Sequence, residues 1–449
     1  MSAEPTPHAR PEAAHAATTL SLHRERFGEL AAKLPGCNLP WLARLREESA
    51  EKLGTWGFPT TKDEAWHYTN LRSLAETALA PSLGSLGSVG ALPPSPAGSA
   101  RLVFVGGQYR ADLSDHAKLP KGVVVAPLAE VTDGSPDLLE PHLGSGTVRD
   151  GLAALNAAFM SDGVVIRVPS GARLDAPVHV IVHGAAGRAS HLRLLVVAEP
   201  ASEVTLVEHY VTQAADPAWT NVVTQAAIGE GAVLRHVKIQ DEAATAFHTA
   251  RVEAMVGAGG AFESFVLAKG GRLARHEIDV SLEGEGARCA LNGITLARAR
   301  QHIDNTTVID HRAPGCTSDE LYRGVLDDEA RAVFQGRIVV RPGAQKTDAH
   351  QLNENLLLSE RAEIDTKPEL EIHADDVKCG HGATAGALDE QALFYLQARG
   401  IGRSHATAML IEAFVSDLLE RVADDRVARL LHDAVAGWLP TARMTEVAA

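Results

Sequence analysis

Aromatic residues are scarce in this chain, since Phe, Trp and Tyr make up 4% of its 449 residues. Valine, leucine, isoleucine and alanine must therefore fill the core, which suits a narrow, layered interior. No apolar run approaches the roughly 20 residues that a membrane-spanning helix needs. The N-terminus has proline, histidine and glutamate where a signal peptide has a basic start and an apolar stretch. We therefore expect no membrane association and no secretion.

Basic residues are also too few for one class of function. Lys and Arg number 42 against 57 Asp and Glu, which gives a formal net charge of −15. Non-specific nucleic-acid binding depends on clustered Lys and Arg, so we expect no nucleic-acid partner. The chain has no P-loop, G-x-S-x-G or H-E-x-x-H sequence. It is therefore not expected to carry an ATP site of the P-loop kind.

The cysteines are few and scattered. No CxxC pair occurs, so neither a disulfide framework nor a CxxC-based zinc site is indicated. We expect a reducing, cytoplasmic setting for these four residues: Cys37, Cys289, Cys316 and Cys379.

The first hundred residues divide into a lead, a helical region and a linker. Residues 1–20 have the composition of a disordered lead. From residue 21 the segments FGELAAKL and WLARLREESAEKLGTWG repeat apolar residues at intervals of three and four, which predicts helices. The Gly-, Ser- and Pro-rich stretch at 83–100 is typical of a linker. Residues 21–100 are therefore predicted to be an N-terminal helical domain with its linker.

Residues 101–387 carry short, valine-rich β-like runs with almost no helical period, apart from a segment at 151–160. Many runs begin at a similar cue, a small residue followed by Ala or Ser, at irregular intervals. Such recurrence predicts a β-solenoid, in which each coil buries its apolar residues against the next. A right-handed parallel β-helix is the favoured architecture. A sandwich of antiparallel hairpins is the alternative, although the Asn-Gly and Asp-Gly turns that it prefers are rare here.

Residues 388–449 return to a helical period and are predicted to be a C-terminal helical domain that docks a partner. Asp389 can cap a first helix, Gly400 can end it and Ser404 can cap a second helix. The apolar stripe is wider than two short helices can bury against each other. It either covers the end of the β domain or binds a partner, through residues that include Leu393, Phe394, Leu410, Phe414 and Leu418.

The densest group of metal-ligand side chains is EIHADDVKCGHGATAG at 371–386. If one strand continued through this segment, His373, Asp375, Cys379 and His381 would point to one side, although only neighbours two residues apart are secure. A Cys-x-His pair offers a thiolate and an imidazole to a soft metal or an iron–sulfur centre. The alternative is a half-buried thiol beside a hydrogen-bonded histidine.

Two further clusters of polar residues include His302 and Asp348, respectively. An enzymatic interpretation is a β-helical polysaccharide lyase or esterase that uses His302, Asp304 and Asp348 as acid and base groups. In a solenoid, however, Asp, Asn and Thr at turns commonly satisfy backbone groups. A structural role is therefore favoured for these residues.

The segment at 301–401, which contains QHIDNTTVIDHRAPGCTSDELYRG and HADDVKCGHGATAG, closely resembles the SufB/SufD family of iron–sulfur cluster assembly proteins. The SufD branch is the nearer one, because Gly382 follows His381 where SufB proteins carry Glu. DEAWHYTNLRSL at 63–74 is similar to the family's Trp-x-Tyr-Thr signature. A SufB-like homodimeric scaffold is the alternative within the family.

The resemblance implies a parallel β-helix between two helical regions and a non-catalytic scaffold subunit. It implies a heterodimer with a SufB-like subunit and docking of a SufC-like ATPase on the C-terminal helices. It also implies that a transient iron–sulfur cluster forms at the SufB–SufD interface, with His381 and its neighbour Cys379 as candidate ligands. The main sulfur-accepting cysteine belongs to SufB, so this chain would contribute half of the site.

Overall fold

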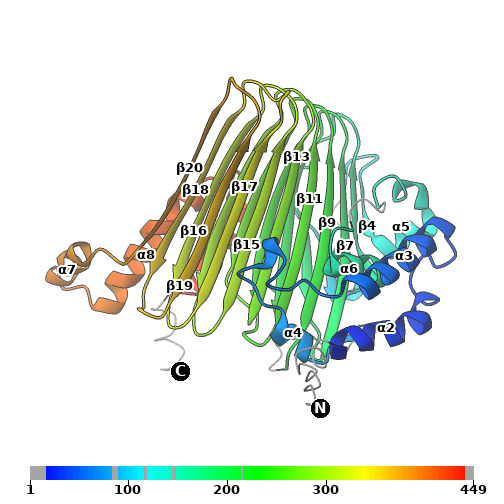
Figure 1. Cartoon of the computed structure of the whole chain (residues 1–449), viewed down its shortest axis with the longest axis horizontal. Coiled ribbons are helices and arrows are strands. Elements are labelled where there is room, and N and C mark those ends of the chain that lie inside the picture. Colours follow the sequence, from blue (N-terminus) through cyan, green and yellow to red (C-terminus); the bar gives the residue numbers. More distant parts are fainter. Residues whose placement is uncertain (1–16, 83–88, 116–118, 144–147, 214–215, 440–449) are drawn as a thin grey trace, which may run out of the picture.

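The structure is a computed structural model that describes residues 17–82, 89–115, 119–143, 148–213 and 216–439. Helices lie at both ends of the chain and a long stack of strands lies between them (Figure 1). The predicted disordered lead at 1–20 falls largely outside the described residues, and its last residues, from Ala17, already belong to the first helix. The helices are α2 (Ala17–Ala31), α3 (Pro40–Trp56), α4 (Arg72–Glu76), α5 (Leu128–Gly134), α6 (Gly151–Phe159), α7 (Glu390–Ala398), α8 (Arg403–Leu419) and α9 (Asp425–Ala436).

The strands form two ten-stranded sheets. The odd sheet has the order β19-β17-β15-β13-β11-β9-β7-β5-β4, and β1 pairs with β7 at its side. Its strands are β1 (Ala80–Pro81), β4 (Val124–Pro127), β5 (Asp162–Val168), β7 (Arg188–Ala198), β9 (Trp219–Ile228), β11 (Phe247–Val256), β13 (Leu273–Leu282), β15 (His302–His311), β17 (Arg331–Val340) and β19 (Glu363–Ile372).

The even sheet has the order β20-β18-β16-β14-β12-β10-β8-β6-β2-β3. Its strands are β2 (Ala100–Val105), β3 (Gln108–Tyr109), β6 (Val178–His183), β8 (Glu203–Thr212), β10 (Val233–Glu242), β12 (Ala261–Ala268), β14 (Arg288–Ala297), β16 (Thr317–Leu326), β18 (Asp348–Leu357) and β20 (Lys378–Gly386).

The chain alternates between the two sheets and winds into a parallel β-solenoid of about eight coils. Its strand pairs are parallel, except for β2 with β3 and β4 with β5 near the N-terminal end. The coil length varies: Trp219 pairs with Phe247, 28 residues later, and Val340 pairs with Ile372, 32 residues later. The predicted mainly β fold, a parallel β-helix between two helical regions, is confirmed, and the variable coil length explains the irregular intervals in the sequence.

The recurring small-residue cue mostly marks the turns from the odd sheet to the even sheet. At these turns, except the one from β19 to β20, one residue has a positive φ, as at Gly231 (62°) and Gly286 (68°), where glycine is favoured because it has no Cβ. Its N–H donates to a carbonyl of the next coil, for example from Gly231 to Ala258 at 2.8 Å. The alanines that follow, Ala232 and Ala287, are fully buried. The cue is therefore a stacked turn with a small residue that fits beneath it.

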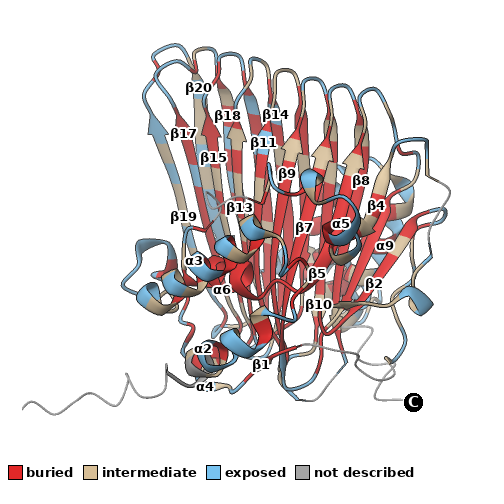
Figure 2. Ribbon diagram, turned by 90° about the vertical axis from the view of Figure 1, so that its right-hand side faces the viewer, coloured by how far each residue is buried: buried red, intermediate tan, exposed pale blue. Residues whose placement is uncertain are grey.

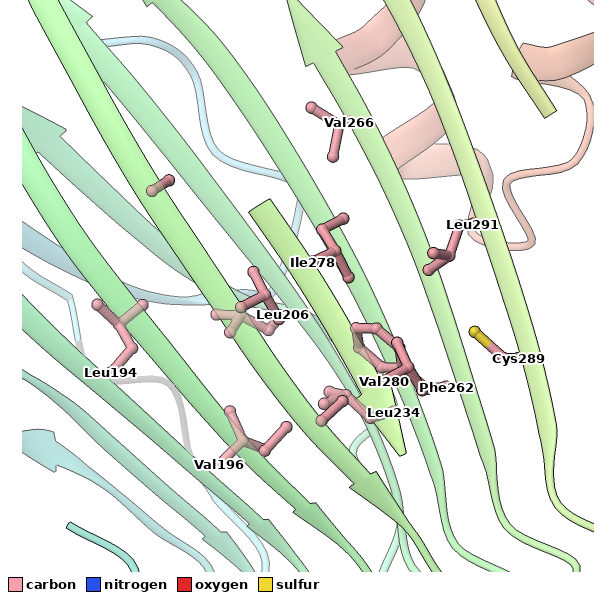
Figure 3. Close-up of a cluster of buried hydrophobic side chains, with 14 of the residues drawn as sticks. Leu194, Val196, Leu206, Leu234, Phe262, Val266, Ile278, Val280, Cys289 and Leu291 are labelled. Atoms are coloured by element: carbon pink, nitrogen blue, oxygen red, sulfur yellow. The ribbon is translucent and has the colours of Figure 1, made fainter. Parts of the chain in front are cut away.

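The main core lies between the two sheets. Aliphatic side chains of both sheets point toward one another there, as Figure 3 shows for Leu194, Val196, Leu206, Ile278 and Leu291. Full burial of one such side chain contributes roughly 1.5–3 kcal/mol. Because many strands are covered on their outer faces as well, they read as continuous apolar runs instead of strict alternation.

The outer face of the odd sheet carries the N-terminal helices. The predicted helix at 151–160 is confirmed as α6, which lies on β7 and β9 with α2 and α3 around it. The signature segment at 63–74 reaches the same face: the Trp66 ring lies 3.9 Å from the Arg275 guanidinium, and Thr69 donates a hydrogen bond to Asp304. These contacts hold the N-terminal region against β13 and β15.

The C-terminal helices lie on the outer face of the even sheet, which corrects one expectation. We expected two helices. Partner docking stays a prediction, but the alternative, a position over the open end of the solenoid, is wrong. Instead α8 and a third helix, α9, pack side by side on Ile294, Leu296 and Val325 of the even sheet. Asp389 caps α7 as predicted, but the residue before α8 is Gly402 instead of Ser404. No helix in the described ranges is long and apolar enough to cross a membrane.

Candidate metal-ligand site

The last coil of the solenoid, made of β19 and β20, has a free edge on both sheets. β19 pairs with β17 and β20 pairs with β18, and neither has a described neighbour on its other side. Figure 2 shows the result: most residues of these two strands are exposed or half-buried, whereas the strands of the middle coils are largely buried. An unpaired strand edge is a ready template for pairing with another chain.

The backbone direction of β20 decides which residues face that edge. The Lys378 N–H donates to the carbonyl of Thr347, the residue that directly precedes β18, at 2.8 Å. In a parallel strand, alternate residues turn their backbone groups to opposite neighbours. Cys379, His381 and Ala383 therefore present their N–H and C=O groups to the open edge.

The edge of β19 differs, because it contains a proline. The N–H groups of Glu363 and His373 donate at 2.9 and 2.8 Å to carbonyls at the two ends of β17, so Pro368, of the other parity, faces the open edge. Proline has no N–H, and proline on an edge strand hinders further pairing. The hydrogen-bonding edge of the last coil is therefore β20.

Cys379 and His381 both belong to β20 and share one parity, as predicted. Cys379 pairs in register with Ala349 and packs against the core between the sheets, with its side chain half-buried. His381 pairs in register with Gln351 and is exposed. The thiol is thus anchored at the open end of the core, and the imidazole two residues on is accessible.

One strand does not continue through 369–381, the condition on which all four side chains would share one side. β19 ends at Ile372, and a turn separates it from β20 at Lys378. His373 and Asp375 lie in that turn, where His373 contacts Glu371 at 2.9 Å. The structure therefore separates the pair of His373 and Asp375 from the pair on β20.

The thiol of Cys379 is protonated at neutral pH. Burial raises its pKa, and the nearby carboxylate of Asp348 raises it further. A metal ion must therefore displace a proton when it binds this sulfur. The other cysteines lie apart: Cys289 and Cys316 are buried, and Cys37 is exposed in the N-terminal region.

The donor set fits part of an iron–sulfur cluster and not a closed metal site. Thiolate and imidazole are both ligands that such clusters use. No group of three or more His, Cys, Asp or Glu within the described ranges could hold a metal ion. Cys379 and His381 therefore supply two ligands at most, and the remaining ligands must come from outside this part of the chain.

The residues of the enzymatic interpretation are not brought together. His302 and Asp304 lie on β15 of the odd sheet, where both contact Thr69 and Asp304 also accepts from Arg275. Asp348 lies on β18 of the even sheet and pairs with His350 at 2.9 Å. These contacts favour the structural role for all three residues.

The apolar residues of the C-terminal helices divide into buried and exposed members. Leu393 of α7 and Leu418 of α8 are fully buried, and Leu410 and Phe414 are half-buried. Phe394 is 72% exposed on α7, which projects away from the sheets (Figure 1). Two further apolar residues are exposed, Met409, which belongs to the predicted apolar stripe, and Tyr395, which was not singled out from the sequence. Phe394 is therefore the centre of the accessible apolar surface.

One group near the site was missed by the sequence interpretation. Gln351, the register partner of His381, is buried and donates from Nε2 to Oε2 of Glu320 at 2.7 Å. The signal lies in the coil length, because Glu320, Gln351 and His381 follow one another at intervals of 31 and 30 residues.

Comparison with known proteins agrees with this architecture. The family model described as "SUF system FeS cluster assembly, SufBD core domain" matches residues 180–414, which is more than half of the chain. The chain belongs to the SufBD family. The model of the SufBD N-terminal region matches residues 97–180 as well.

Named SufBD relatives cover most of the chain. The iron–sulfur cluster assembly protein SufD of Escherichia coli is 31% identical over 401 residues, which is 88% of this chain and 92% of the relative. A SufBD family protein of Synechocystis is 32% identical over 400 residues, 85% of this chain and 87% of the relative. SufD of Bacillus subtilis is 28% identical over 403 residues, 87% of this chain and 92% of the relative. The predicted SufB/SufD resemblance is confirmed, and two of these relatives are named SufD.

Proposed function

We propose that this chain is a scaffold subunit of a SufBCD-type complex that assembles iron–sulfur clusters. It pairs with a SufB-like subunit through the open edge of β20 and holds a SufC-like ATPase on its C-terminal helices. At the interface with the SufB-like subunit, Cys379 and His381 serve as ligands of the nascent cluster, which is cargo of the complex. The chain itself is not an enzyme, and the complex works in the cytoplasm.

One observation carries the proposal: the ligand pair lies on the strand whose backbone is free to pair. Cys379 and His381 belong to the residues of β20 that face the open edge. A strand that pairs there brings its own side chains next to both residues. Two ligands from one chain and the rest from a second chain complete the coordination that the described residues lack.

The chemistry of the two side chains differs. His381 offers an imidazole nitrogen, a common metal ligand, to iron. Cys379 binds only after its thiol proton has been displaced, and its raised pKa makes this step unfavourable while the site is empty. The pair therefore holds iron only when further ligands bind at the same time, as expected of a transient site.

The energy source lies in the partner. ATP binding by two SufC-like subunits, one on each scaffold chain, would draw the helical regions together and strain the interface. The docking surface on this chain comprises Phe394 with Leu410 and Phe414, above the buried Leu393 and Leu418. α8 transmits force to the even sheet, because Arg323 of β16 donates to the Phe414 carbonyl at 2.5 Å and to Asp417.

The ligand role is tested by co-expression with SufB-like and SufC-like chains, size exclusion, and assays of iron and sulfide. We expect His381→Ala to leave the assembly intact and to lower its bound iron and sulfide at least tenfold. The matched control is His373→Ala, since His373 is an exposed histidine of the adjacent turn. Unchanged cluster content with His381→Ala would make this chain a structural tether.

The same experiment separates the two kinds of assembly. A heterodimer with the SufB-like chain supports the proposal. If the chain forms only a homodimer that holds a cluster, the SufB-like homodimeric scaffold is the better description.

The docking surface is tested on α7. Phe394→Glu should abolish co-purification with the SufC-like ATPase, because a charge then replaces the most exposed apolar side chain. Gln397→Glu adds the same charge to an exposed position of the same helix and should retain the ATPase. Equal loss with both variants would indicate a general charge effect and contradict the docking role of Phe394.

A further inference from the structure

A column of side chains runs along the core-facing side of the even sheet and ends at the candidate ligand His381. In register along β14, β16, β18 and β20 it contains Leu291, Glu320, Gln351 and His381. Leu291 belongs to the apolar core, whereas the next two residues are polar and almost completely buried, with 1% and 2% of their surface exposed. The interior therefore becomes polar over the two coils that precede His381.

The amide of Gln351 has a fixed place in this column. Its Nε2 donates to Oε2 of Glu320 at 2.7 Å. The amide extends across the interior to Gly336 of β17, where an added Cβ would lie 1.7 Å from Nε2. The missing side chain at Gly336 thus makes room for the amide, and the Glu320 carboxylate defines which end of it is the donor.

The other end of this amide lacks a partner within the described residues. Oε1 of Gln351 is buried and accepts no hydrogen bond there. A buried acceptor without a donor costs about 1–3 kcal/mol, so native proteins rarely leave one. The next residue of the column is His381, one strand spacing of about 4.8 Å away. An imidazole has an N–H to donate in either neutral tautomer.

We propose that Gln351 is a positioning residue for His381: its Oε1 accepts a hydrogen bond from one imidazole nitrogen and leaves the other nitrogen free to bind iron. Glu320 acts indirectly, because it holds the amide of Gln351 in the orientation that presents Oε1 to His381. Partners of this kind fix the tautomer and ring orientation of a ligand histidine. The role in cluster binding rests on the proposed function, whereas the hydrogen bond itself does not.

The experiment reads the imidazole directly in the isolated chain and in the complex. Histidine is labelled with ¹⁵N, and ring nitrogen–proton correlation spectra assign His381 by its loss in His381→Ala. We expect one tautomer of His381 in the wild-type chain and a mixture in Gln351→Met, which keeps the side-chain length and removes the acceptor. Asn353→Leu is the matched control, since Asn353 lies on β18 two residues on and donates to the Tyr322 carbonyl instead.

A double variant distinguishes positioning from mere packing. Glu320→Gln together with Gln351→Glu exchanges the two groups, so the amide still donates to the carboxylate and an acceptor oxygen remains beneath His381. We expect this exchange to restore the single tautomer and the cluster content that Gln351→Met lowers about 10–100-fold, the usual effect of removing such a partner. The exchange also serves if Gln351→Met fails to fold.

The outcomes separate this inference from the proposed function. An unchanged tautomer in folded Gln351→Met overturns the positioning role. A changed tautomer in a complex whose cluster survives His381→Ala supports the hydrogen bond and overturns the ligand role instead.

Discussion

The middle coils and the open end of the solenoid are built from the same strand unit, but their buried polar groups differ in the partners that they have. In the middle, the buried Glu208 receives hydrogen bonds from Tyr210 at 2.6 Å and Thr224 at 2.7 Å, and Lys238 lies 3.2 Å away. These partners come from β8 itself and from the two strands that follow it, β9 and β10. At the open end, the amide of Gln351 on β18 has, among the described residues, one partner, Glu320 of the preceding even-sheet strand β16. The difference teaches that a buried polar group of the middle coils finds partners in the strands that follow it, whereas near the open end β20 is the last strand that can supply a partner to Gln351.

The largest expected effect on the free energy of unfolding comes from removing a buried ion-pair partner in the middle coils. Burial alone would raise the pKa of Glu208, but Lys238 and His236 outweigh it and hold this pKa well below its usual range. Lys238→Met leaves the carboxylate without its strongest cation and should lower the free energy of unfolding by about 3–5 kcal/mol. Urea denaturation measures this change. Lys269→Met, at a half-exposed pair with Asp241, should cost less than about 1 kcal/mol, and equal losses would contradict the comparison.

The next effect is a loss of stability in acid, caused by buried neutral histidines. Burial lowers the pKa of His311 to about 4. The unfolded chain binds this proton near pH 6.5, so stability falls as the pH drops from 6.5 to 4, by about 3 kcal/mol for this residue. Glu320 works in the opposite sense, because burial raises its pKa to about 7 and the folded chain binds that proton first.

Two variants distinguish the contributions of His311 and Glu320 to the pH dependence of stability, measured by urea denaturation between pH 4 and 7.5. His311→Gln should flatten the acid decline, and Glu320→Gln should make it steeper because a compensating proton is lost. A decline that neither variant alters would place the titrating groups elsewhere.

The third prediction sharpens the comparison at the open edge. Ala383→Pro removes an N–H that faces the edge, so the free chain should change in stability by less than about 1 kcal/mol while pairing with the SufB-like subunit is lost. Thr384→Pro removes an N–H of the other parity, which faces β18, and should destabilise the free chain by about 1–3 kcal/mol. Thermal unfolding and co-purification measure the two effects. If Ala383→Pro still pairs normally with the SufB-like subunit, β20 does not form the interface.

The smallest effect concerns the blocked edge. Pro368→Val restores an N–H in the middle of β19 and should change stability by less than about 1 kcal/mol. We expect instead a concentration-dependent rise in self-association, measured by sedimentation, because a second edge becomes able to pair. Thr366→Val is the control, since it leaves Pro368 in place. Without any rise, the proline has no protective role.

The solenoid was predictable because its signal repeats. A left-handed residue followed by a small one, as at Gly231 and Ala232, recurs at most turns into the even sheet and is visible in the sequence. The pair on β20 was also predictable, since two residues of one strand share a face without knowledge of the fold. Gln351 was not, because its place beneath His381 depends on a coil length that varies.

The C-terminal region shows the same limit. The apolar residues of α8 predicted a helix with a covered face, but they did not predict that the outer face of the even sheet covers it. α9 was missed, although Asp424 caps it and its apolar residues Val427 and Leu431 are buried. Contacts between distant segments decide such positions, and one sequence does not reveal them.

The clamp between the N-terminal signature and the solenoid sets an order of folding. Thr69 meets Asp304 across 235 residues of chain, and the Arg275 guanidinium reaches the Ala65 carbonyl across 210. Neighbouring coils need a separation of only about 30 residues, so they close sooner. During synthesis the segment around Trp66 therefore leaves the ribosome long before its binding surface exists. The segment around Trp66 is therefore synthesised early but packs late. A nascent chain that stalls before β15 keeps this aromatic segment exposed to chaperones.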